Sequence, residues 1–294
     1  MILSVIIPIG NLASNFQNIQ NIITESSNLT IEFIFILDTN ETLAFQELHK
    51  LCTTYLNKNY TILTCDDRNP GSSRNLGIVA SSGEWIIFCD CDDLPYLANA
   101  INTIATSNKN SQILIGSFEI EKLDSAKNQT SNSELVTNKE WETIANKPGI
   151  WRWIFKRDLI STVKFPKFSM GEDQYFLIQI LGLEPEIEFT SKVLYKYRFG
   201  TINSLTQSKN NLMDLAAVLQ LELGIEKFPK KYTTVKNLLI LRQIITLFKN
   251  GRAFQKVQAL NFLRRFLFSI SASDYKTCFS FIVFIVSKQV VHYV

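Results

Sequence analysis

Residues 83–93 read Gly83-Glu84-Trp85-Ile86-Ile87-Phe88-Cys89-Asp90-Cys91-Asp92-Asp93, an apolar run that ends in three acids. The run predicts a buried strand. Three similar runs precede it, at 3–9, 31–37 and 60–65. Segments long enough for helices separate the runs, at 16–25, 42–56 and 74–81. Strands that alternate with helices indicate an α/β fold with a mostly parallel central sheet flanked by helices.

The rest of the chain divides into a mixed part and a helical part. One more strand is predicted at 112–118, and the polar stretch 121–139 after it is expected to be a surface loop. Short mixed elements are expected at 150–200. Beyond residue 211 the pattern is helical, with two helices at 235–248 and 252–268 that Asn250-Gly251 separates.

The composition is that of a folded chain with an uneven distribution of charge. Of the 294 residues 46% are hydrophobic and only 19% are charged, which excludes an intrinsically disordered protein. The five cysteines are odd in number and form no Cys-x-x-Cys pair, so neither a disulfide framework nor a zinc site is expected. Residues 1–210 carry 18 Lys and Arg against 23 Asp and Glu, whereas residues 211–294 carry 12 against 4, a net charge of +8. This asymmetry indicates that the C-terminal part meets an anionic partner.

Acids follow two of the predicted strands. Parallel α/β sheets bind ligands at the carboxyl ends of their strands, and Asp38 follows the second strand while Asp90 and Asp92 follow the fourth. A strand alternates its faces with period two, so Asp90 and Asp92 point the same way if the strand persists. Two adjacent carboxylates indicate a divalent cation such as Mg²⁺ or Mn²⁺. The alternative is a solvated acidic turn that ends a strand.

Three further segments are candidates for chemistry. The turn from Gly71 to Ser73 leads into a predicted helix that carries Arg74, a pattern that suits phosphate oxygens, although a Ser N-cap explains it equally well. Glu172 and Asp173, in the segment Gly171–Phe176, are either helix caps or a general base for a hydroxyl nucleophile. The run from Tyr195 to Arg198 is either a diphosphate or acceptor clamp or an ordinary strand with exposed cations.

Taken in this order, the segments resemble the family 2 inverting glycosyltransferases of the GT-A fold, over roughly residues 1–205. The matching segments are Ser4–Pro8, Asp38, Ser73–Ile78, Gly83–Asp93 and Gly171–Phe176. The resemblance implies a GT-A, Rossmann-like catalytic domain over residues 1–210, followed by a basic, helical extension over residues 211–294. It also implies a bacterial enzyme of surface-glycan assembly.

The resemblance assigns a role to each matching residue. It makes Asp173 the catalytic base, with Glu172 as the second candidate, and it implies a Mn²⁺ or Mg²⁺ ion on Asp92 and Asp90. Further contacts to the nucleotide-diphosphate sugar, expected to be a UDP-sugar, are implied for Pro8, Asp38, Arg74, Asp90 and Arg198. Trp151 and Arg152 are implied on the acceptor side. The acceptor is expected to be a hydroxyl of a growing glycan or a lipid-linked saccharide, and no nucleic-acid partner is expected.

Two other functions remain open at this point. A sugar-phosphate nucleotidyltransferase also needs a metal and a nucleotide, but it carries a Gly-rich, Arg-containing loop after its first strand, whereas this chain has Ile9-Gly10-Asn11-Leu12. A degenerate relative that binds sugar nucleotides or membranes without turnover is the non-enzymatic alternative. The three acids Asp90, Asp92 and Asp173 argue against it.

The basic extension predicts association with a membrane surface. Residues 252–270 place apolar side chains at helical intervals beside Arg252, Lys256, Arg264 and Arg265, which is typical of a helix on an anionic membrane surface. The alternative is a helical appendage packed on the catalytic domain with a solvated basic face. The N-terminus resembles a first strand and not a signal peptide, so a cytoplasmic enzyme, peripheral on the inner face of the plasma membrane, is expected.

Overall fold

The computed structural model describes residues 2–38, 42–56, 59–124, 129–136, 145, 147–199 and 212–290. The chain forms two compact units that interleave along the sequence, and each is described by itself. The first, the sheet unit, consists of Met1–Asn138, Ile150–Lys167 and Pro185–Ser204. The second, the helical unit, consists of Lys139–Gly149, Phe168–Glu184 and Leu205–Val294.

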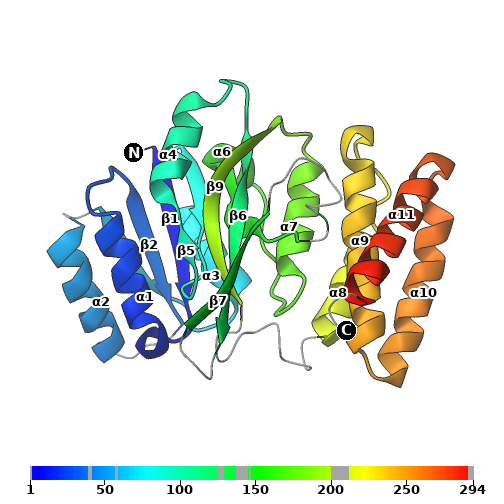
Figure 1. Cartoon of the computed structure of the whole chain (residues 1–294), viewed down its shortest axis with the longest axis horizontal. Helices are drawn as coiled ribbons and strands as arrows, with labels where there is room; N and C mark the ends of the chain where they lie inside the picture. Colours follow the sequence, from blue (N-terminus) through cyan, green and yellow to red (C-terminus); the bar gives the residue numbers. More distant parts are fainter. Residues whose placement is uncertain are drawn as a thin grey trace. The chain divides into compact units, whose positions relative to one another are not determined.

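The sheet unit is built on a mixed sheet (Figure 1). In the described residues its strands are ordered β3-β2-β1-β4-β8-β6-β9-β5, and β7 pairs with β6 outside this path. The block β3-β2-β1-β4 is parallel, β8 is antiparallel to both β4 and β6, and β6 and β9 are again parallel. The strands are β1 (Leu3–Ile9), β2 (Glu32–Leu37), β3 (Tyr60–Thr64), β4 (Trp85–Phe88), β5 (Leu94–Pro95), β6 (Ile113–Asp124), β7 (Gln129–Val136), β8 (Trp153–Lys156) and β9 (Ile187–Phe199). The helices of this unit are α1 (Leu12–Glu25), α2 (Thr42–Tyr55), α3 (Pro70–Ala80), α4 (Leu97–Thr106), the short 3₁₀ helix η1 (Ile150–Arg152) and α6 (Arg157–Ile160).

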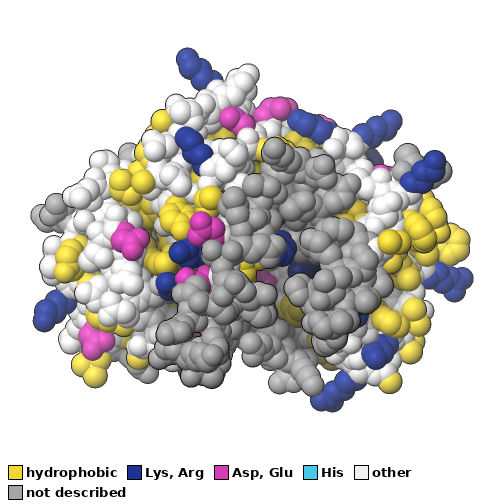
Figure 2. All heavy atoms as spheres, in the orientation of Figure 1, with side chains coloured by type: hydrophobic (Ala, Val, Ile, Leu, Met, Phe, Trp, Pro, Cys, Tyr) yellow, Lys and Arg dark blue, Asp and Glu magenta, His cyan; other side chains and the backbone are white. Residues whose placement is uncertain are grey.

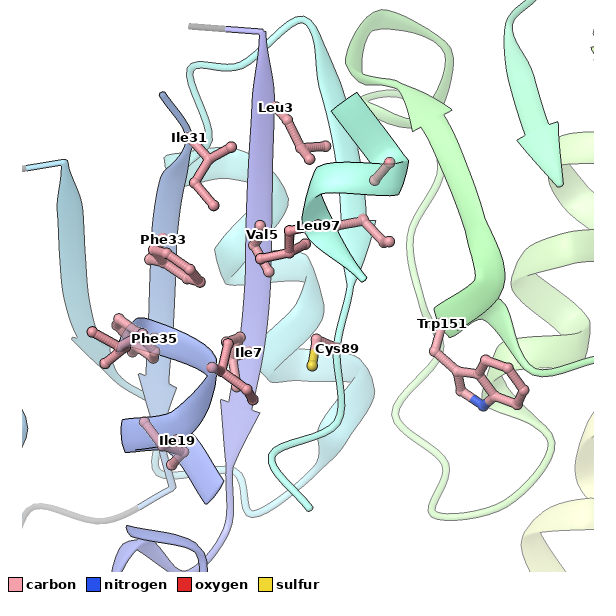
Figure 3. Close-up of a cluster of buried hydrophobic side chains, with 14 of the residues drawn as sticks. Leu3, Val5, Ile7, Ile19, Ile31, Phe33, Phe35, Cys89, Leu97 and Trp151 are labelled. Atoms are coloured by element: carbon pink, nitrogen blue, oxygen red, sulfur yellow. The ribbon is translucent and has the colours of Figure 1, made fainter. Parts of the chain in front are cut away.

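Both faces of the parallel block are covered by helices. The side chains of Val5, Ile7, Phe33 and Phe35 alternate onto one face and pack in a single apolar cluster with residues of α1, α2 and α4, such as Ile19 (Figure 3). On the opposite face α3 contacts β1 and β2. Strands buried on both faces need continuous apolar runs, which is why the sequence shows unbroken runs here.

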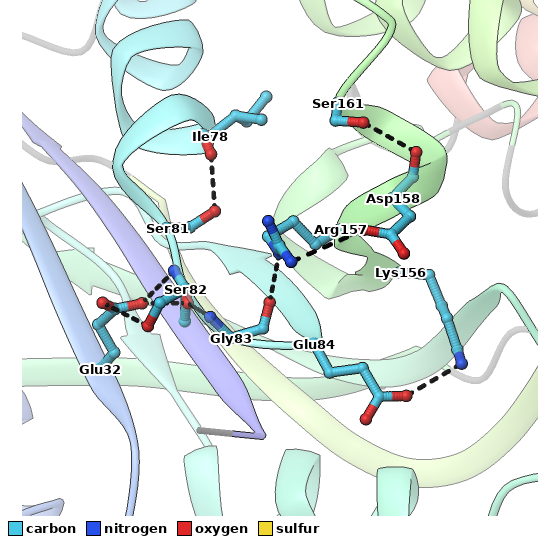
Figure 4. Close-up of polar contacts among 11 residues, drawn as sticks. Glu32, Ile78, Ser81, Ser82, Gly83, Glu84, Lys156, Arg157, Asp158 and Ser161 are labelled. Atoms are coloured by element: carbon cyan, nitrogen blue, oxygen red, sulfur yellow. Dashed lines mark hydrogen bonds and ion pairs between the residues drawn. The ribbon is translucent and has the colours of Figure 1, made fainter.

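A network of polar contacts holds the turn before β4 (Figure 4). The Glu32 carboxylate accepts hydrogen bonds from the Ser4 hydroxyl and from the backbone N–H and the hydroxyl of Ser82. The Ser4 hydroxyl in turn accepts from the N–H of Gly83, and a Cβ at residue 83 would lie 2.6 Å from that oxygen. The glycine of the Gly83–Asp93 segment is therefore required by close packing at the end of β4 that lies opposite Asp90.

The predicted strands and helices are largely confirmed, with two corrections. The stretch 121–139 is not a loop throughout, because β6 continues to Asp124 and β7 pairs with it antiparallel. A polar strand at a sheet edge has no apolar alternation, so the pattern could not reveal it. The helix predicted at 74–81 begins at Pro70. Its N-cap is Asn69 and not a serine, and the side chain of Asn69 accepts a hydrogen bond from the N–H of Ser72.

The helical unit contains α7 together with the C-terminal helices. In this unit α9 contacts α7, α8, α10 and α11 and buries side chains such as Leu238 and Ile240. The C-cap Gly251 separates α9 from α10 at the predicted place. In the part of the chain that the structure describes, no helix is long and apolar enough to cross a membrane. The helices of this unit are α7 (Glu172–Leu181), α8 (Leu212–Glu222), α9 (Lys230–Asn250), α10 (Ala253–Ser269) and α11 (Ala272–Val290).

Candidate active site

The carboxyl ends of β1 and β2 bring Pro8 and Asp38 to one edge of the sheet. Pro8 lies opposite Ile36 in the β1–β2 ladder, and the N–H of Asp38 donates to the carbonyl of Ile9. Burial raises the pKa of the Asp38 carboxyl above its usual value, against the lowering effect of Arg68. Its buried Oδ1 has no hydrogen-bond partner among the described residues. This edge therefore presents an acceptor that a donor group of a ligand can satisfy.

The acidic turn, residues Asp90–Asp93, follows β4 at the same edge. Arg74 extends from α3 to the turn, and its Nη2 lies 3.0 Å from Oδ1 of Asp90. The Arg74 side chain is 6% exposed and stacks over the ring of Phe165, with its guanidinium carbon 5.6 Å from the centroid. The Asp90 side chain is 34% exposed, so the pair combines a fixed cation with a carboxylate that solvent reaches. The structure thus joins two of the predicted site residues directly.

Asn18 of α1 joins the acidic turn to β9. Its side-chain amide donates to the carbonyl oxygens of Cys91 and Asp93, at 2.9 Å and 2.7 Å. Its Oδ1 accepts from Nη1 of Arg198, while Nε of Arg198 donates to Glu121 at 2.8 Å. The guanidinium of Arg198, predicted to contact the nucleotide-sugar donor, therefore bonds the residue that holds the turn. We call these three residues, Asn18, Arg198 and Glu121, the turn latch.

Asp93 is the buried member of the turn. Its side chain is 1% exposed, and Oδ1 accepts from the backbone N–H of Arg198 at 2.7 Å. Burial, and then the charge of Asp90, raise the pKa of the Asp93 carboxyl well above its usual range. The backbone N–H of Asp90 donates to the Tyr195 hydroxyl at 3.0 Å. Both ends of the turn are thus tied to β9, which fixes the backbone that carries Asp90 and Asp92.

The aromatic neighbours of the turn include Trp151. Its ring stacks on Tyr195 and Tyr197, at centroid distances of 4.6 Å and 5.5 Å. Trp151 is 8% exposed and the neighbouring Arg152 is fully buried over the ring of Phe118. Burial lowers the pKa of Arg152 to about 9. Both residues are packed among aromatic side chains, and their place on the acceptor side stays a prediction.

The acidic turn suits a hard divalent cation only in part. Within the described ranges no group of three or more His, Cys, Asp and Glu side chains is arranged to hold a metal ion. Mg²⁺, however, is commonly held by one or two carboxylates together with substrate phosphates, and Asp90 and Asp92 supply two carboxylates on one turn. These two carboxylates are therefore the ligands that the turn could contribute to a cation that a diphosphate also holds.

The predicted base lies in the helical unit, at the start of α7. The N-cap is Gly171, whose φ of 86° is in the left-handed region that favours glycine. Glu172 is buried and Asp173 is half-buried, and both stand in the first turn, where the helix dipole stabilises carboxylates. A Cβ at residue 171 would approach Gln243 Oε1 to 3.3 Å, and the amide of Gln243 donates to both oxygens of the buried Glu222.

Several of these residues gave no signal in the sequence. Asn18 contacts the turn from α1, and Glu121 contacts Arg198 from β6. Both elements lie far from the turn along the chain, so no spacing pattern points to these residues. Asp93 stands in the acidic motif, but only the structure shows that it faces inward while Asp90 reaches solvent. For Tyr195 the sequence indicates only a place in a strand with cations, and not its hydrogen bond to the turn. Asp38, Arg74 and Asp90 lie where the strand and helix ends predicted them.

Comparison with known proteins identifies the class. The model of glycosyl transferase family 2 matches residues 4–178, so the chain belongs to this family and is a glycosyltransferase. No curated protein matches the chain. Among solved structures, S. aureus TarS 1–349 in complex with UDP-GlcNAc shares 14% identity with a TM-score of 0.68 over 93% of this chain and 83% of that chain. Mannosyltransferase PcManGT from Pyrobaculum calidifontis, in complex with GDP-Man and Mn²⁺, shares 12% identity with a TM-score of 0.61, over 99% of this chain and 82% of that chain. The likeness confirms the GT-A fold.

Proposed function

We propose that this glycosyltransferase transfers a sugar from a nucleotide-diphosphate sugar to an acceptor hydroxyl, with inversion at the anomeric carbon. The observation that carries the proposal is the pairing of Arg74 with the partly exposed acid Asp90 at the carboxyl edge of the sheet, in a chain of family 2. The complexes of TarS with UDP-GlcNAc and with UDP support a UDP-sugar as donor, while that of the mannosyltransferase holds GDP-Man.

The sheet unit supplies the residues that bind the donor. Asp38 accepts an N–H of the base through its buried Oδ1, at the edge where Pro8 ends β1. Arg74 balances the charge of Asp90 and meets the diphosphate. Asp90 and Asp92 hold Mn²⁺ or Mg²⁺ together with the diphosphate. A bound cation of this kind stabilises the negative charge that develops on the leaving diphosphate.

The proposed base stands in the first turn of α7. Asp173 removes the proton from the acceptor hydroxyl, and Glu172, which is more deeply buried, is the second candidate. Attack on the face opposite the leaving diphosphate inverts the anomeric centre, so that an α-linked donor gives a β-glycoside. Trp151 and Arg152 shape the acceptor side. We further propose a catalytic domain over residues 1–210, with residues 211–294 as its extension.

The acceptor is a hydroxyl of a growing glycan or of a lipid-linked saccharide, in the assembly of a bacterial surface glycan. A cytoplasmic location is part of this proposal. It is supported by the cysteines, all five of which are free thiols, as is usual in reducing compartments. Failure of the chain to release nucleoside diphosphate from any sugar nucleotide would favour a non-catalytic, nucleotide-binding relative. Release of pyrophosphate from a nucleoside triphosphate and a sugar phosphate would favour a nucleotidyltransferase.

The test measures donor binding and turnover with and without Mn²⁺. Calorimetry should show UDP-sugar binding that depends on Mn²⁺ and that Asp92→Ala abolishes, while circular dichroism shows an intact fold. Asp158→Ala, at a solvated acid of the same unit, is the matched control and should bind like the parent. Donor affinity that Asp92→Ala leaves unchanged in the presence of Mn²⁺ would remove the metal from the proposal.

A further inference from the structure

Helix α10 is apolar on two opposite sides. Its inner side packs in the helical unit through Ala259, Phe262 and Phe266. Large apolar side chains also point outward from the same helix, and Phe268 and Phe254 are 82% and 67% exposed. We call the outward set the outer face: Phe254, Val257, Leu260, Leu267 and Phe268. A helix that merely covers a core carries polar side chains on its outward side, so packing does not explain this face.

The outer face continues onto α11. Tyr275, Phe279 and Val283 recur every four residues there, and each is more than half exposed. A small apolar groove joins the two helices, because Leu267 of α10 and Phe279 of α11 both line it. Figure 2 shows apolar side chains in yellow at the right of the view, where Figure 1 places α10 and α11, with Lys and Arg in dark blue among them. At this groove the exposed apolar side chains of the two helices lie next to one another, so they gather in one region of the helical unit.

The charged side chains of this part of the sequence are almost all positive. From Lys227 to the C-terminus the sequence contains a single acid, Asp274, whose carboxylate accepts hydrogen bonds from Thr234 and Ser271. The cations lie beside the exposed rings. Lys256 Nζ is 6.0 Å from the centroid of Phe248, and the guanidinium carbon of Arg264 is 5.9 Å from that of Phe268. Aromatic rings flanked by Lys and Arg suit the boundary between lipid headgroups and acyl chains.

We propose that the outer face of α10, with the stripe on α11, binds the surface of an anionic lipid bilayer. The aromatic side chains enter the headgroup region, while the cations meet the acidic headgroups. A second copy of this chain fits less well, because two copies of the face would bring cations against cations. The surface serves attachment and takes no part in the chemistry of the acidic turn.

The full chain should float with vesicles of phosphatidylcholine that contain phosphatidylserine, and not with phosphatidylcholine alone. Flotation should weaken as salt is raised, because salt screens exposed charges. The paired change Lys256→Gln with Arg264→Gln should lower vesicle affinity about 25-fold, roughly fivefold for each cation. Phe254→Ser with Phe268→Ser should lower it at least ~10-fold, because two rings then stay in water. All four side chains lie on the surface, so the fold should tolerate both pairs.

Matched controls lie on the sheet unit. Val79→Ser removes an apolar side chain that is 83% exposed, and Lys50→Gln with Lys109→Gln removes two exposed cations. Both control variants should float like the parent. Absence of the full chain from anionic vesicles at low salt would overturn the proposal. An equal loss of vesicle affinity in the control variants would also overturn it. The same holds if the parent is a dimer in solution and Phe254→Ser with Phe268→Ser makes it a monomer. The flotation test does not depend on binding of the nucleotide sugar. A negative result would therefore leave the proposed function unaffected.

Discussion

Replacement of Asn18 by Ala should loosen the acidic turn without disturbing the core. The side chain of Asn18 is half-buried, and it donates to the carbonyl oxygens of Cys91 and Asp93 in the turn. Removal leaves the carbonyls of Cys91 and Asp93 and the guanidinium of Arg198 without this partner. The neighbouring Ile19 and Ile22 stay packed, because they belong to the buried side of the helix.

The size of the effect follows from the contacts. Each neutral hydrogen bond contributes about 0.5–1.5 kcal/mol, and the bond to the charged guanidinium about 1.5–3 kcal/mol. At a half-buried site water replaces part of the lost hydrogen bonding. The free energy of local opening of the turn should therefore fall by about 2–3 kcal/mol. That change corresponds to a loss of roughly 30-fold to 150-fold in the protection of the turn amides against hydrogen exchange. If Asp90 and Asp92 hold the cation as proposed, Mn²⁺ must then order the turn itself, and its affinity should fall about tenfold.

Hydrogen exchange of a peptide that contains Asp90 to Asp93 measures the opening, and calorimetry of Mn²⁺ with UDP measures the affinity. Gln17→Ala is the matched control, because Gln17 precedes Asn18 on α1 and bonds only to Asn21 in the described contacts. Unchanged protection of the turn in Asn18→Ala would refute the latch. Lost protection with unchanged Mn²⁺ affinity would show that the latch serves the fold and that the cation does not use this turn.

The other predictions concern the helical unit. Asp173→Asn should lower turnover about 10²-fold to 10⁴-fold and keep donor affinity, with the exposed Glu184→Gln as control. A larger effect of Glu172→Gln in the same kinetic assay would assign the base to Glu172 instead. Burial raises the pKa of Glu222 to about 8, so the folded chain keeps a proton that the unfolded chain releases, and stability falls as pH rises from about 4.5 to 8. Glu222→Gln should remove this decline and raise the free energy of unfolding at pH 8 by roughly 3–5 kcal/mol over the parent. Near pH 4 the two proteins should differ little. Equal denaturation curves of the two proteins at pH 8 would contradict the burial argument.

Local pattern was sufficient for the elements and for part of the site. Strands β1, β2 and β4 are buried on both faces, so each is a mostly apolar run in the sequence. The acids that follow β2 and β4 stand at one edge because parallel strands end together, and this needs no tertiary information beyond the strand direction. The order of these segments also predicted the family, which the match over residues 4–178 confirms.

Pattern failed where the deciding contact is remote or where the strand is polar. Strand β7 pairs only with β6 and has no apolar period, so the sequence pattern predicts a loop there. The helix of Arg74 begins one turn earlier than predicted, because Asn69 and Pro70 form a better start than the serines that follow.

The sequence by itself determined the α/β elements, the family and the acids at the strand ends, because periodicity and chain direction are local properties. Only the tertiary structure decided which of those acids face solvent and what holds them. Asp90 is partly exposed and Asp93 is buried although they are three residues apart, since the Asp93 carboxylate accepts from the backbone of β9 whereas that of Asp90 pairs with Arg74 of α3. Asn18 lies 73 residues from Cys91 along the chain, and no local pattern encodes a hydrogen bond that forms only when α1 packs beside the end of β4.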